Sequence, residues 1–190
     1  MLARALLIAA VLAAAPAHAE PANDPLSRSL ESDTDRLCFR RDYDAAHLKR
    51  QPKQVTQAVL LSFSRGDAYI MLRQRGEEHY IVAACEWSRK AGYDTSGRRM
   101  VKAFKGPGGH GCIVIVSSSS AEEGGYVLLD PAADGRALTL HVQSPTTART
   151  GLRGKASAYN FKLGRDDLEF RLTRTDRAAC QAMDAGLDGP

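Results

Sequence analysis

The stretch Leu138-Thr139-Leu140-His141-Val142-Gln143 carries an apolar side chain at every second residue, and Leu168-Glu169-Phe170-Arg171-Leu172-Thr173 repeats the pattern. Successive side chains of a β-strand point to opposite faces of the sheet, so this alternation predicts two strands with one buried and one wet face. His141 alternates with the apolar residues of its stretch. We therefore expect its side chain to face solvent.

Six further segments have the composition of strands and are separated by turn residues rich in Gly, Pro, Asp and Ser. They cover residues 55–63, 68–72, 80–87, 112–116, 126–129 and 157–163. All but the last are apolar on both faces, which predicts that they are the better covered strands. The sequence Gly164-Arg165-Asp166 predicts a hairpin connection between the last two strands.

The order and spacing of these strands predict an all-β protein. About eight antiparallel strands with mostly short connections suit an up-and-down barrel or a strongly curved sheet, because closure removes exposed strand edges. A two-sheet sandwich is the alternative. Two connections are long, at residues 88–111 and 144–154. We also expect a helical turn at 42–49 and a short C-terminal helix, capped by Thr175 or Asp176, that plugs or braces one end.

The N-terminal region divides into an export signal and a leader. Arg4 precedes an apolar run that ends before Ala17-His18-Ala19, and this order is typical of a signal peptide covering residues 1–19. Residues 20–36 hold prolines, serines and charges, which predicts a flexible leader. Residues 37–190 then form a single β domain. We expect a soluble periplasmic or secreted protein without a membrane anchor.

Four cysteines remain after signal removal, and an oxidising compartment favours their pairing. Cys38 opens the predicted domain and Cys180 closes it, whereas Cys85 and Cys112 lie in strands that flank one long loop. We therefore predict the disulfides Cys38–Cys180 and Cys85–Cys112. A zinc site is the alternative, but the close cysteine pairs of structural zinc sites are absent from the sequence.

Composition and motifs exclude several functional classes. The chain is 44% hydrophobic and 25% charged, which is typical of a globular protein. It has 26 Lys+Arg against 22 Asp+Glu, so the mature protein, without Arg4, carries 25 − 22 = +3 charges. The basic residues are interleaved with acidic ones, which argues against nucleic acid as a partner. Histidine spacing predicts no local metal site, no nucleophile motif is present, and we expect no cofactor and no enzymatic activity.

The long loop between residues 87 and 111 is the best candidate binding surface. It combines one large aromatic side chain, a row of basic groups and a glycine-rich end, and we expect His110 to be exposed at the tip of that end. The candidate binding residues are Trp87, Arg89, Arg98, Arg99, Lys102, Lys105 and His110.

Three functional hypotheses follow from these observations. The first is a non-enzymatic binding module, for example a protein inhibitor, which meets a protein partner in the cell envelope or extracellular space. It would act through the 87–111 loop and the 144–154 connection. The second is a carrier that holds a small apolar ligand inside the barrel. The third is a hydrolase, metal-dependent or serine, with a site assembled across strands.

Overall fold

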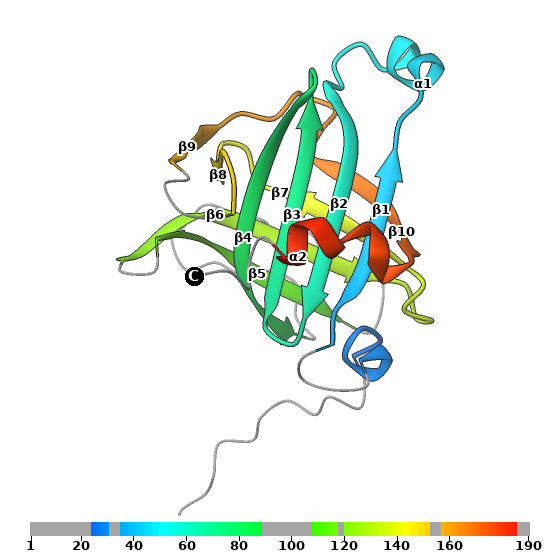
Figure 1. Cartoon of the computed structure of the whole chain (residues 1–190), viewed down its shortest axis with the longest axis vertical. Helices are drawn as coiled ribbons and strands as arrows, with labels where there is room; N and C mark the ends of the chain where they lie inside the picture. Colours follow the sequence, from blue (N-terminus) through cyan, green and yellow to red (C-terminus); the bar gives the residue numbers. More distant parts are fainter. Residues whose placement is uncertain (1–23, 31–34, 89–107, 118–119, 153–156, 186–190) are drawn as a thin grey trace, which may run out of the picture.

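The computed structural model describes residues 24–30, 35–88, 108–117, 120–152 and 157–185, and these residues form a mostly β structure (Figure 1). The described strands, in chain order, are β1 (Leu37–Asp42), β2 (Thr56–Ser64), β3 (Asp67–Gln74), β4 (Glu77–Ser88), β5 (Gly109–Ser117), β6 (Ser120–Pro131), β7 (Ala137–Val142), β8 (Thr146–Arg149), β9 (Ala158–Phe161) and β10 (Glu169–Thr175). The helices are α1 (Ala45–Arg50), α2 (Gln181–Ala185) and the 3-10 turns η2 (Ser27–Ser29) and η3 (Arg177–Ala179).

Eight of these strands close into an antiparallel barrel. The order β3-β2-β1-β10-β7-β6-β5-β4 is completed by pairing of β3 with β4. Within the series β1 to β7, each strand pairs with the next strand in the sequence, which is the up-and-down arrangement. β10 follows β7 in the barrel, because β8 and β9 lie outside the wall. The predicted barrel is therefore confirmed. The first strand, β1, closes the barrel by pairing with the last, β10.

The remaining two strands form a hairpin outside the barrel wall. β8 pairs with β9, and it contacts the barrel through the pair Tyr80 and Arg149. The sequence assigned 157–163 to the barrel and joined it to β10 by a hairpin turn. That assignment is wrong, because β9 pairs with β8 whereas β10 pairs with β1 and β7. The unpredicted strand β1 takes its place in the barrel.

The barrel interior is filled by apolar side chains. Leu138 and Leu140 of β7 lie opposite Leu172 and Phe170 of β10, and all four are buried in one core cluster, as their alternation predicted. The largest fully buried side chains of the described residues include Phe39, Phe63, Phe170, Leu61, Ile70, Leu72, Ile81, Leu129, Leu140 and Leu172.

The predicted exposure of His141 is wrong. The residue is only 8% exposed, and its Nδ1 lies 3.5 Å from Glu169 Oε2 on the neighbouring strand. The alternation of a strand assigns a residue to a face, but it does not show what covers that face. Here the cross-strand neighbours of His141 are Glu169 and the buried Leu128.

The predicted C-terminal helix is present, and its position differs from the prediction. Asp176 caps η3 by accepting a hydrogen bond from Ala178 N. The following helix α2 lies across the outer face of the barrel rather than at an end, and in Figure 1 it crosses in front of the strands. It belongs to a second apolar cluster with Cys38, Met71, Cys180 and Met183. Among the described helices, none has the length and apolar character needed to cross a membrane.

Both predicted disulfides are present. Cys38 of β1 is bonded to Cys180 at the start of α2, and Cys85 of β4 is bonded to its cross-strand partner Cys112 of β5. The first bond fixes α2 on the barrel wall, and the second joins two neighbouring barrel strands. Two disulfides indicate that the protein folds in an oxidising environment, extracellular or periplasmic.

Both ends of the barrel are covered by segments that are not part of its wall. At one end the β8–β9 hairpin contributes Ala148 and Phe161 to the core. At the other end the segment 24–30 contributes Leu26, 0% exposed, and Leu30, 5% exposed. This part of the predicted leader is therefore packed into the barrel. Gly135 of the β6–β7 turn has φ +67°, and a Cβ there would come within 2.8 Å of Pro25 O, so the turn fits closely against the segment.

Candidate functional site

Two of the predicted binding residues, Trp87 and His110, meet at the barrel end that segment 24–30 covers. They are cross-strand partners on β4 and β5, with ring centroids 5.2 Å apart. His110 also packs edge-on against Phe63, with centroids 4.7 Å apart. The predicted exposure of His110 is wrong, because the residue is only 3% exposed and lies at the start of a strand rather than at a loop tip.

A buried carboxylate faces His110. Asp24 is 1% exposed, and its Oδ2 lies 3.0 Å from His110 Nε2. It also accepts hydrogen bonds from the Ser27 hydroxyl and from Leu26 N, the latter at 2.9 Å. Burial raises the pKa of Asp24, but the interaction with His110 and the hydrogen bonds from Ser27 and Leu26 outweigh it, so the pKa lies below its ordinary value. The carboxylate is therefore ionised at neutral pH.

The other predicted binding residues cannot be assigned to this cluster. Arg89, Arg98, Arg99, Lys102 and Lys105 lie outside the described residues. Of the predicted loop, the structure describes only its two ends, which are the end of β4 and the start of β5.

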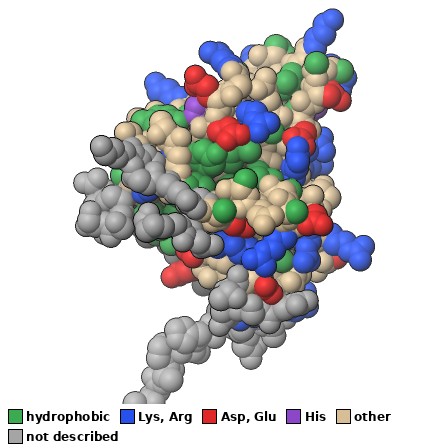
Figure 2. Space-filling view, viewed as in Figure 1, with side chains coloured by type: hydrophobic (Ala, Val, Ile, Leu, Met, Phe, Trp, Pro, Cys, Tyr) green, Lys and Arg blue, Asp and Glu red, His purple; other side chains and the backbone are tan. Residues whose placement is uncertain are grey.

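A groove on the outer face of the barrel is a second candidate site. It has a volume of about 500 Å³ and lies between strands β2 to β4, residues 150–152 after β8, and the helical segment η3–α2. Its apolar side chains are Leu60, Met71, Tyr80, Leu152, Ala179, Ala182 and Met183. Figure 2 shows this face, with an apolar area beside α2 and charged side chains at its edge. The groove therefore includes part of the predicted 144–154 connection.

The polar rim of the groove is an internally paired triad. Arg73 Nη2 lies 2.7 Å from Glu78 Oε1, and the Tyr80 hydroxyl donates to Glu78 Oε2 at 2.6 Å. The hydrogen bonds from Tyr80 and Arg73 lower the pKa of Glu78. Burial, followed by the hydrogen bond to Glu78, raises the pKa of Tyr80 to about 12. The rim thus consists of the Arg73–Glu78 ion pair, which has no net charge, and the protonated phenol of Tyr80.

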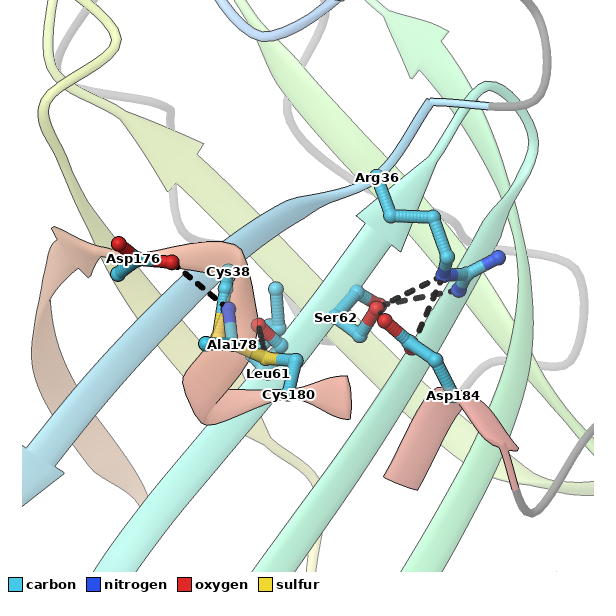
Figure 3. Close-up of a disulfide and its surroundings, with 8 residues drawn as sticks. All are labelled: Arg36, Cys38, Leu61, Ser62, Asp176, Ala178, Cys180 and Asp184. Atoms are coloured by element: carbon cyan, nitrogen blue, oxygen red, sulfur yellow. Dashed lines mark hydrogen bonds and ion pairs between the residues drawn. A yellow bond between two sulfur atoms is a disulfide. The ribbon is translucent and has the colours of Figure 1, made fainter. Parts of the chain in front are cut away.

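Two attachments hold the helical wall of the groove in place (Figure 3). The disulfide Cys38–Cys180 fixes one end of α2. At the other end Asp184 Oδ1 accepts a 2.6 Å hydrogen bond from the buried Ser62 hydroxyl and lies 3.2 Å from Arg36 Nε. A five-residue helix is too short to be stable by itself, so these attachments determine where α2 lies.

No local sequence pattern predicts either the role of Asp24 or the groove. Asp24 stands in a stretch whose composition is that of a leader, and the groove combines residues from distant segments. The described residues contain no cluster of three or more His, Cys, Asp or Glu side chains that could bind a metal. Comparisons with protein families, with curated proteins and with solved structures found no match for this chain.

Proposed function

We propose that this chain is an exported, non-enzymatic binding module that engages a protein partner in the cell envelope or extracellular space. Residues 1–19 would direct export and be removed. The groove beside α2 would form the binding surface, with the basic loop between Trp87 and Gly111 as a further contact. An inhibitor of another protein is one form that such a module takes.

The observation that carries this proposal is the fixed geometry of the groove. A disulfide at one end and the Ser62–Asp184 hydrogen bond at the other hold α2 against the strands. Preorganised surfaces lose less conformational entropy on binding, and this favours affinity. With segment 24–30 in place the barrel core is filled by its own side chains, which favours an external surface over an internal carrier site.

The chemistry of the groove favours apolar side chains of the partner. Met71 and Met183 are unbranched and adapt to differently shaped apolar groups. The charges of Arg73 and Glu78 neutralise each other at the rim. Binding in the groove should therefore depend weakly on salt, because exposed charges contribute little to it.

Replacing Ala182 by Arg should block the groove without disturbing the fold. Ala182 lines the groove and is exposed on α2, so a long side chain there fills space without entering the core. We expect a partner to bind at least tenfold more weakly, which corresponds to about 1.4 kcal/mol. The measurement is capture from cell-envelope extract read by mass spectrometry, followed by affinity measurement with the purified partner.

Ala185→Arg is the matched control, because Ala185 is exposed on the same helix but does not line the groove. A partner that binds the parent and both variants equally would contradict the groove as the binding surface. Melting curves of the three proteins should coincide.

The basic loop has its own test. Replacing Arg98 and Arg99 together by Ala should weaken a partner complex by about 2 kcal/mol or more, because arginines often dominate interface energies. The loss should shrink as salt rises, since charges are screened over about 8 Å at physiological ionic strength. Affinity is measured for parent and variant at two salt concentrations. An unchanged affinity and an unchanged salt slope would remove the loop from the binding surface.

A further inference from the structure

The barrel end around His110 contains polar atoms without partners. His110 is almost completely buried, yet its Nδ1 has no hydrogen-bond partner among the described residues, and the same holds for the buried indole nitrogen of Trp87. Among the described residues, the carboxylate beside the imidazole is that of Asp24, which lies close to Nε2 but does not form a well-directed hydrogen bond with it. Buried polar groups in folded proteins are normally satisfied, so unpaired ones indicate a missing partner.

The segment that covers this end is weakly integrated into the barrel. The hydrogen bonds of its backbone are local: Arg28 N to Asp24 O, Ser29 N to Leu26 O, and Leu30 N to Ser27 O. Its described attachments to the barrel are made by side chains and by packing: the Asp24–His110 pair, the burial of Leu26 and Leu30, and the close fit of Pro25 and Ser29 against Gly135. A segment held without described backbone hydrogen bonds to the barrel opens at a lower free energy than the hydrogen-bonded strands of the wall.

We infer that this end of the barrel is a binding site for a small amphipathic carboxylate, and that segment 24–30 is its built-in occupant. The Asp24 carboxylate then stands where the carboxylate of the ligand would meet His110. Leu26 and Leu30 fill the space that its apolar part would take. The Trp87 Nε1 donor and the ring nitrogen His110 Nδ1 are left for further polar atoms of the ligand.

The two displaced side chains set the size of the ligand. Two leucine side chains correspond to an apolar chain of about eight carbon atoms, and a buried apolar pocket with few polar groups is the usual form of a small-molecule site. Among the described residues, the charged group within ion-pair distance of His110 is Asp24, while β2 and β4 present the aromatic rings of Phe63 and Trp87. An anionic head group therefore fits this site once Asp24 withdraws.

Octanoate is a suitable probe, and the protein supplies its own reporter. Trp87 is the single tryptophan of the chain, so a change in its emission on titration reports this site directly. We expect octanoate to bind the oxidised protein lacking residues 1–19 and to shift Trp87 emission. The neutral 1-octanol should bind at least tenfold more weakly. No change in Trp87 emission with octanoate, or equal binding of the two probes, would overturn the inference.

Variants that weaken the packing of segment 24–30 against the barrel should increase the affinity for octanoate. The apparent affinity falls with the fraction of molecules in which the site is open, so Asp24→Asn and Leu26→Ala should each bind octanoate at least tenfold more tightly than the parent. Asp166→Asn changes an exposed carboxylate elsewhere and should bind like the parent. If Asp24→Asn and Asp166→Asn gave the same affinity, segment 24–30 would not be a competitor.

A further variant tests the imidazole of His110. His110→Phe keeps an aromatic ring between Phe63 and Trp87 and removes the imidazole, so octanoate binding should fall at least tenfold. Unchanged binding would remove His110 from the site, and the Asp24 and Leu26 variants still decide the case if this variant does not fold. Ala182→Arg should leave octanoate binding unchanged. The groove proposed above and this site can therefore fail independently.

Discussion

Replacing Cys38 and Cys180 together by Ser is expected to lower the free energy of unfolding by about 5 kcal/mol, because the bond closes a loop with a sequence separation of 142 residues. The cost arises mainly in the unfolded chain, which gains freedom when so long a loop opens. This loss approaches the whole stability of an ordinary domain. Urea unfolding followed by circular dichroism, on parent and variant, measures it.

The second disulfide provides the matched comparison. Cys85 and Cys112 are separated by 27 residues, so their joint replacement by Ser should cost about 3–4 kcal/mol in the same treatment. Hydrogen exchange separates the two variants further, since only the first should expose the backbone of α2. A larger loss for the Cys85 and Cys112 pair would contradict the loop-length explanation.

Replacing Asp167 by Ala should cost about 3–5 kcal/mol, because three backbone N–H groups lose their acceptor. The side chain is 0% exposed. Its Oδ2 accepts from Val55 N at 2.9 Å and from Gly164 N at 3.2 Å, and its Oδ1 accepts from Thr56 N at 3.2 Å. The carboxylate thus fastens the connection between β9 and β10 to the start of β2.

Neighbouring residues make this prediction specific. Asp166→Ala removes an exposed carboxylate from the same turn and should change stability by less than about 0.5 kcal/mol. Asp167→Asn should fall between the two, since one oxygen still accepts while the amide group meets backbone donors. Thermal and urea unfolding of the three variants give the order. An Asp167→Ala protein as stable as Asp166→Ala would show that water or a backbone shift replaces the carboxylate.

The parts of the fold that the sequence predicted are those whose signal is local. The alternation of β7 and β10 follows from one buried face, and the positions of four cysteines in strands and at domain ends were sufficient to pair them. Strand β1 was not predicted, because Leu37-Cys38-Phe39 is followed by Arg40-Arg41-Asp42, which breaks the alternation of apolar and polar residues. Strand β8 is only four residues long, and its sequence, Thr146-Thr147-Ala148-Arg149, is mostly polar.

The site depended on contacts that no local pattern encodes. His110 adjoins glycines and therefore resembled a loop residue, but Phe63 and Trp87 enclose it. Leu26 and Leu30 are two apolar residues in a polar stretch, which is too little to predict a packed segment, although both reach the core. Asp167 follows a turn-like Gly-Arg-Asp sequence. Two of its three backbone partners, Val55 and Thr56, are more than a hundred residues away in the sequence.

The pairing of β1 with β10 also constrains the time course of folding. Strands β2 to β7 pair with their neighbours in the sequence, and among their connections only the one between β4 and β5, residues 89–108, is long. In contrast, Phe39 meets Arg174, and that contact cannot form until nearly the whole chain has been synthesised. Contacts of such high sequence separation slow folding, and an unpaired strand edge invites pairing with other chains. Until its last strand arrives, the nascent protein is therefore an open sheet whose β1 edge needs protection from its neighbours.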